Sequence, residues 1–264
     1  MATRTPWPNS DFRIMPRCGR VPVRAIHGTC IRVCCLAALL LLLLGCDAVD
    51  GATTRPSAVP VDTVAVDDAH PTIPPVPPTP SDRSADAYLA RAADSYHRHD
   101  LDAAIMEYTQ ALALQADSAE AYQGRGLAYY GRGDLDRAIA DFTQALALRP
   151  NAATIYNNRG LAYYDQGDRT QAIVDYTRAI TTQPDLAEAY YNRGRVRYDQ
   201  GALEQAITDY TQTLTLNPDF AYAYTWRGYA YHNRGDLDRA IADYSHAIAL
   251  KPTSVDAYLG RGLA

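Results

Sequence analysis

Aromatic and small residues recur at three- and four-residue steps along most of the chain. Tyr122, Gly126 and Tyr129 follow this spacing, and a second run with the same spacing surrounds Phe142. Residues three and four positions apart lie on one face of an α-helix. The pattern therefore predicts two amphipathic helices, separated by a break at Gly133.

The break between the two helices carries residues that end one helix and begin another. Gly133 can adopt the left-handed conformation that often closes a helix. Asp134 is expected to cap the second helix by accepting a backbone N–H bond. Pro150 prevents that helix from continuing. Gly126, which faces the small Ala138, is expected to let the two helices approach closely. The predicted unit is a helix, a tight turn and a second helix.

This unit returns every 34 residues. A fixed period of this length predicts a stacked array, because each helix pair covers the apolar face of its neighbour. The first unit has Ala92, Ser95 and Ala116 where later units have Gly, Tyr and Pro, which is typical of a terminal cap. The units span residues 85–118, 119–152, 153–186, 187–220 and 221–254, and a partial unit spans 255–264.

The recurring order of an aromatic residue, Gly, Tyr, Ala, an aromatic residue, Ala and Pro resembles the tetratricopeptide repeat family. The resemblance covers residues 85–264. It implies an all-α fold of tandem helix-turn-helix repeats, stacked into a right-handed solenoid with a concave groove. It also implies a protein that binds other proteins and carries no catalytic chemistry in its repeats.

Charged residues recur at two inward-facing places of the unit. Each first helix has an arginine where the family usually has an apolar residue, and each second helix has an acid at a matching place. A buried arginine without a partner would be costly, so we predict a ladder of ion pairs. The alternative is an arginine row that binds anions. The expected pairs are Arg91 with Glu107, Arg125 with Asp141, Arg159 with Asp175, Arg193 with Asp209 and Arg227 with Asp243.

The resemblance also implies where a ligand would lie. In the family, first-helix residues that point away from the second helix line the inner groove. Aromatic and amide side chains there suit a peptide or protein segment. The alternative is that many of the tyrosines pack between adjacent first helices. A chaperone-type carboxylate clamp is not expected, because the groove offers no lysine. The groove residues are Gln123, Tyr130, Asn157, Asn158, Tyr164, Asp165, Tyr191, Asn192, Tyr198, Asp199, Tyr222, Trp226, His232 and Asn233.

The N-terminal segment differs in composition from the repeats. The apolar run Cys34–Leu44 follows arginines at positions 13, 17, 20, 24 and 32 and is too short to span a bilayer comfortably. This arrangement is typical of a secretory signal. Its ending, Leu43-Leu44-Gly45-Cys46, resembles a bacterial lipobox. The resemblance implies that residues 1–45 are removed and that Cys46 receives a lipid. The alternative is an uncleaved signal anchor, which places the array on the same side of the membrane.

Residues 46–84 connect this leader to the array. They contain the sequence PTIPPVPPTPS and few large apolar residues, so we predict a disordered, partly extended tether. All five cysteines lie in residues 1–46, which excludes disulfides and cysteine-built metal sites from the repeats. The first 46 residues carry about +5 and the remainder about −10, which argues against nucleic acid as a ligand.

Taken together, the sequence predicts a lipid-anchored, extracytoplasmic scaffold that binds a protein or peptide segment of a cell-envelope partner. No metal, cofactor or small-molecule substrate is expected. His97 and His99 lie two positions apart, which points them to different sides of a helix. The alternative function is that of a self-associating structural protein, or of a truncated piece of a longer array, acting through its C-terminal end.

Overall fold

The computed structural model describes residues 84–264, which form eleven α-helices and no strand. The signal segment 1–45, the lipid site Cys46 and all but the last residue of the tether lie outside the described residues. The helices are α1 Ala85–His97, α2 Leu101–Leu114, α3 Ala119–Arg132, α4 Leu135–Leu148, α5 Ala153–Gln166, α6 Arg169–Thr182, α7 Ala187–Asp199, α8 Leu203–Leu216, α9 Ala221–Arg234, α10 Leu237–Leu250 and α11 Val255–Leu263.

The first ten helices form five consecutive pairs, and a residue with positive φ lies in the turn between the two helices of each pair. Gly133 lies between α3 and α4 with φ 87°, and Gly167, Gly201 and Gly235 occupy the same place in later pairs. The first pair has His99 near this turn, at φ 62°. Glycine takes this conformation without a Cβ penalty, so the turn repeats with little strain from α3 onward.

Asp134 does not cap α4, so this prediction is wrong. The residue occupies the N-cap position, but its side chain accepts no backbone N–H bond. Its carboxylate lies 3.3 Å from both Arg132 and Arg137. Asp236 has equivalent arginine neighbours and keeps only a long contact of 3.4 Å with the backbone of Arg239. Competition from nearby guanidinium groups explains both observations.

An aromatic ring of the second helix packs over a glycine of the first in each inner pair. A Cβ placed on Gly126 would lie 2.8 Å from the ring of Phe142, and one on Gly160 would lie 2.7 Å from Tyr176. The atoms nearest to this place at Gly126 belong to the ring of Phe142. Phe142 and Tyr176 are essentially unexposed and form the centre of each unit.

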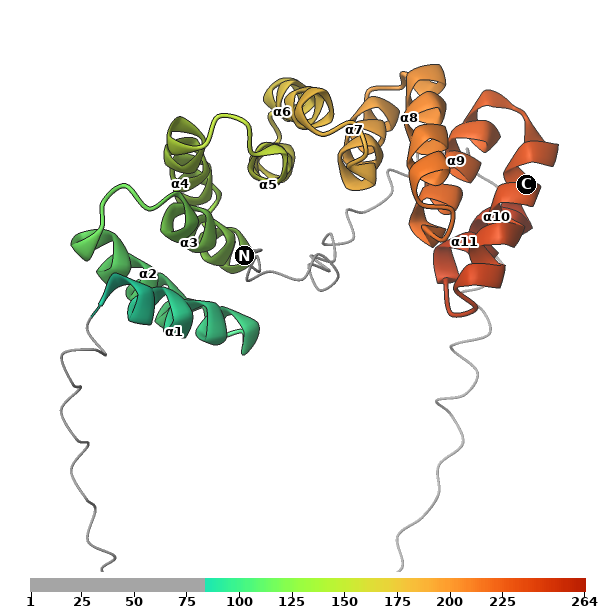
Figure 1. Ribbon diagram of the computed structural model, residues 1–264. Coiled ribbons are helices and arrows are strands. Elements are labelled where there is room, and N and C mark those ends of the chain that lie inside the picture. The colour runs from blue at the N-terminus through green and yellow to red at the C-terminus, as the bar shows by residue number, and fades with distance from the viewer. Residues whose placement is uncertain (1–83) are drawn as a thin grey trace, which may run out of the picture. The chain divides into compact units, whose positions relative to one another are not determined.

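The pairs stack into an arc in which α3 and α5 lie on the inner side of α4 and α6 (Figure 1). Successive first helices contact one another: α3 contacts α5, α5 contacts α7, and α7 contacts α9. Within residues 84–264, the second helices of neighbouring pairs make no such contact. The first helices are therefore closer together and define the inner face. The all-α solenoid of tandem helix pairs is confirmed.

Candidate functional site

The inner face is built from α3, α5, α7 and α9, and the predicted groove residues divide there by exposure. Four are exposed to solvent, namely Asp165, Asp199, Asn233 and Tyr222 (40% exposed), and seven others are partly exposed. Three are buried and cannot offer their side chains freely to a ligand. The partly exposed residues are Gln123, Tyr130, Asn158, Tyr164, Tyr198, Trp226 and His232, and the buried ones are Asn157, Tyr191 and Asn192.

The three buried residues make contacts inside the array instead of forming a binding surface. The amide nitrogen of Asn192 donates to Oδ1 of Asn157 at 3.0 Å, which ties α7 to α5. The ring of Tyr191 packs against Tyr210 and Phe220, with centroids 6.1 and 4.9 Å apart. The assignment of Asn157, Tyr191 and Asn192 to the ligand-contacting surface is therefore corrected: they support that surface from below.

Hydrogen bonds between consecutive first helices fix three of the partly exposed residues in place. Each bond joins side chains 35 residues apart, so it runs from one unit to the next. Burial and the bond to Asp199 both raise the pKa of the Tyr164 hydroxyl, to about 12, although Arg195 opposes them. This hydroxyl thus remains a donor at neutral pH. The bonds are Tyr130 to Asp165 (2.6 Å), Tyr164 to Asp199 (2.6 Å) and Asn233 to Tyr198 (2.7 Å).

Sequence reasoning missed Arg195, which lies on α7 at the centre of this face. Its guanidinium carbon is 4.9 Å from the ring centre of Tyr164 and 5.4 Å from that of Trp226. The residue is only 8% exposed. A signal was available: Leu127 and Leu161 occupy the corresponding places in the two preceding units, so a charge there breaks the pattern.

The ladder arginines lie against the carboxylates of their own units. Arg159 Nε and Nη2 donate to the two oxygens of Asp175 at 2.7 and 2.8 Å. Arg125 and Arg227 make the same two-bond contact with Asp141 and Asp243. The outermost pair is looser, with Arg91 Nε 3.5 Å from Glu107. These carboxylates are nearly buried, whereas the arginine side chains keep some exposure.

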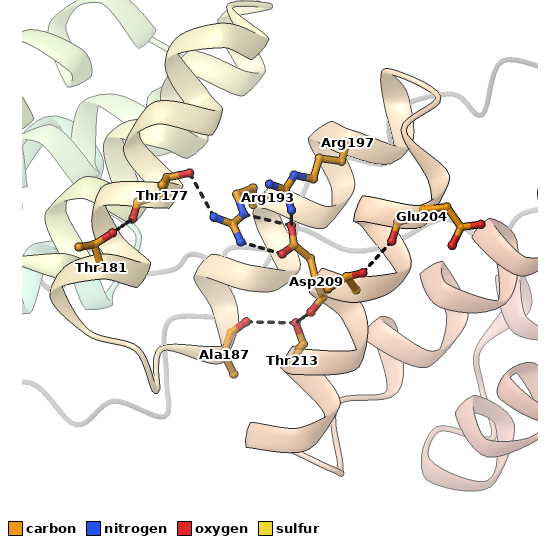
Figure 2. Close-up of polar contacts among 9 residues, drawn as sticks. Thr177, Thr181, Ala187, Arg193, Arg197, Glu204, Asp209 and Thr213 are labelled. Carbon is orange, nitrogen blue, oxygen red and sulfur yellow. Dashed lines mark hydrogen bonds and ion pairs between the residues drawn. The ribbon is translucent and has the colours of Figure 1, made fainter.

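Each inner ion pair of the ladder, called a rung below, also contacts the preceding unit, because the third guanidinium nitrogen of its arginine donates to a threonine there. Figure 2 shows this at Asp209, which accepts from Arg193 and from Arg197, while Arg193 Nη1 donates to Thr177 at 3.2 Å. Arg159 contacts Thr143 in the same way, at 3.0 Å. All three nitrogens of these guanidinium groups are engaged. Each guanidinium charge is balanced by a carboxylate and each of its nitrogens donates within the array, which favours the ion-pair ladder over a row that binds external anions.

The described residues show neither a candidate metal site nor a candidate membrane-spanning helix. No group of three His, Cys, Asp or Glu side chains there is arranged to hold a metal ion. None of the helices from α1 to α11 has the length and apolar character needed to cross a membrane. The inner face is thus the most developed candidate site of the array.

Comparison with known proteins agrees with this architecture. The family model described as TPR repeat matches residues 96–133, 126–167, 160–201, 194–235 and 228–264. No curated protein sequence matches the chain.

Solved structures supply three close comparisons. MamA is 26% identical, covering 65% of this chain and 93% of its own, with a TM-score of 0.58. YrrB, described as a TPR protein with an unusual peptide-binding site, is 22% identical, covering 69% and 93%, with a TM-score of 0.57. PilF of Pseudomonas aeruginosa is 20% identical, covering 68% and 82%, with a TM-score of 0.62. YrrB and PilF are less than 25% identical to this chain, so their similarity concerns the fold alone.

Proposed function

Because the chain belongs to the tetratricopeptide repeat family, we propose that it is a non-enzymatic scaffold whose inner face binds a peptide or protein segment. The observation that carries this proposal is the row of partly exposed aromatic and amide side chains on the first helices. Trp226, Tyr198 and Tyr164 lie on three successive first helices and are held by contacts between units. Side chains arranged in such a row could contact successive residues of one extended peptide segment.

The chemistry of these side chains suits a peptide. Tyrosine and tryptophan supply large contact areas at low entropic cost and dominate many binding interfaces. Asn158, which is partly exposed on α5, can both donate to and accept from a peptide backbone. The bonds between units already hold Tyr164 and Tyr198 in position, so little ordering remains to oppose binding.

The proposed location rests on the sequence outside the described residues. A lipid on Cys46 and a proline-rich tether over residues 46–84 would hold the array at an envelope membrane, on its extracytoplasmic side. The ligand we propose is accordingly a segment of a cell-envelope protein. Labelling cells with a radioactive fatty acid tests the anchor, because Cys46→Ala should abolish incorporation into the chain. Incorporation by that variant would contradict the lipid assignment.

A peptide library displayed on phage tests the binding function. The purified chain is immobilised beside a Trp226→Ala/Asn158→Ala variant and a Met106→Ala control. Met106 is 60% exposed on the second helix α2, away from the inner face. Peptides enriched by the wild type and the control, but lost by the double variant, would support the proposal. The same peptides on all three proteins, or on none, would contradict it.

Self-association is a second candidate function, favoured by the apolar surface of α11. Val255, Leu259 and Leu263 are 68%, 59% and 74% exposed. Contiguous apolar surface of this kind favours association with another protein surface. Analytical ultracentrifugation should then show dimers or larger species that Leu259→Glu reduces to monomers. A wild-type chain that stays monomeric at high concentration would exclude this function.

A further inference from the structure

Arg195 is a buried cation without a carboxylate partner in the described part of the chain. Its Nε–H is enclosed and meets no acceptor. Its Nη2 donates a single long bond of 3.3 Å to the hydroxyl of Tyr164. Burying a charged group without full hydrogen bonding costs free energy, so this arrangement has an unmet demand for an acceptor.

Packing does not explain the arginine at this place. The corresponding residues of the two preceding units are Leu127 and Leu161, which fill the position with apolar side chains. Two residues earlier on the same helix, Arg193 makes two bonds to Asp209 at 2.8 and 3.1 Å. The fold thus supplies a carboxylate to the ladder arginine and none to Arg195.

Two of the side chains that surround the buried Arg195 are partly exposed on the inner face. Its guanidinium lies between Tyr164 of α5 and Trp226 of α9, and both of these side chains are partly exposed. The buried rings of Tyr191, Tyr176 and Tyr210 also lie near it and carry no charge at neutral pH. The guanidinium of Arg195 therefore lies between two aromatic side chains of first helices, Tyr164 and Trp226, which a bound segment would contact.

One acid lies close to this place but does not neutralise it. Asp199, on the same helix, accepts the hydroxyl hydrogen of Tyr164 at 2.6 Å, and that hydroxyl in turn accepts from Arg195. Asp199 is thus one hydrogen bond removed from the guanidinium. Its charge disfavours a strongly anionic ligand, which limits what can bind beside it.

We propose that Arg195 receives a carboxylate of the peptide segment, with Tyr164 and Trp226 enclosing the pair. This inference rests on the proposed binding function. The two terminal nitrogens of a guanidinium can donate two parallel bonds to a carboxylate, and one positive charge balances one negative charge. A phosphate dianion would stay uncompensated next to Asp199. The site uses one arginine between aromatic rings and differs from a clamp built on lysine.

The experiment observes the site through its own tryptophan. Trp7→Phe leaves Trp226 as the single tryptophan of the full chain, so its indole N–H gives one NMR signal. The probes are N-acetylglycine, the α-amide of N-acetylaspartate, N-acetylglycinamide and inorganic phosphate, all at constant ionic strength. The first probe carries a terminal carboxylate and the second a side-chain carboxylate. Comparing them shows which kind of peptide carboxylate the site binds. The third is a neutral control.

We expect a saturable shift of the Trp226 signal with at least one carboxylate probe and none with the neutral amide. Arg195→Leu should weaken that binding about tenfold or more, because it removes a charge-assisted contact. Arg195→Lys retains the charge without the fork and should bind more weakly than the wild type. Asp199→Asn should bind more tightly, since it removes the neighbouring negative charge.

Three results would overturn the inference: equal shifts with the neutral amide, tighter binding of phosphate than of either carboxylate, or undiminished binding by both Arg195 variants. Leucine already occupies this place in two units, and circular dichroism checks that Arg195→Leu folds. The phage-selected peptides separate this inference from the proposed function. If Trp226→Ala loses them and Arg195→Leu keeps them, the groove binds peptides but the carboxylate site is wrong.

Discussion

At the scale of single residues, the centre of each unit is filled by a ring that differs between units in one atom. Phe142 and Tyr210 occupy equivalent places, and both are essentially unexposed. The hydroxyl of Tyr210 is buried without a partner among the described residues. A buried donor that loses its hydrogen bonds to water costs about 1–3 kcal/mol. The tyrosine is therefore less favourable for stability than phenylalanine would be.

Tyr210→Phe should accordingly stabilise the array by about 1 kcal/mol, because it removes an unsatisfied hydroxyl and keeps the ring. Chemical denaturation followed by circular dichroism measures the change. Phe142→Tyr is the matched control, since it introduces the same hydroxyl at the equivalent place and should destabilise. A loss of stability in Tyr210→Phe would mean that this hydroxyl bonds to water or to another group.

At the scale of the helix pair, each inner rung joins three helices. Arg159 on α5 contacts Asp175 on α6 and Thr143 on α4, so it connects its own unit to the preceding one. Asp175 has a side chain only 2% exposed. The bond between Arg159 and Asp175 is therefore the strongest part of the rung. If Arg159 is removed, water cannot solvate the buried carboxylate of Asp175.

Arg159→Ala should destabilise the array by about 3 kcal/mol, because it leaves the Asp175 carboxylate buried and uncompensated. Thr143→Val should cost about 1 kcal/mol or less, since its bond lies at the exposed end of the rung. A double-mutant cycle between the two positions measures their coupling. Arg137→Ala is the control, because that arginine is largely exposed. An unchanged unfolding midpoint for Arg159→Ala would refute the structural role of the ladder.

The elements could be predicted from the sequence because they depend on features that each unit carries within itself. The helix spacing, the turn at Gly133 and the pairing of Arg159 with Asp175 all repeat with the period. Contacts that join different units were harder to predict. The burial of Asn192 depends on Asn157 of the neighbouring unit, and the environment of Arg195 depends on helices on both sides. No spacing within one unit contains that information.

At the scale of the whole array, stability comes from contacts within units and between neighbours. Several of these contacts use tyrosines whose hydroxyls are removed from water. Burial raises the pKa of Tyr176 and Tyr210 well above its ordinary value, and it raises the pKa of Tyr164 to about 12. The unfolded chain ionises these groups near pH 10, so it loses protons before the folded array does.

Stability should therefore be unaffected by these groups below about pH 10 and should fall as the pH rises from 10 toward 12. In this range the unfolded state binds fewer protons, so each increase in pH favours unfolding. The part of the tyrosinate absorbance that comes from the buried tyrosines should change together with circular dichroism, because these hydroxyls ionise only when the array opens. Tyr176→Phe/Tyr210→Phe should flatten the pH dependence, since two of the linked protons are removed. Ionisation of all tyrosines while the helices persist would show that the array lets hydroxide reach its centre without unfolding.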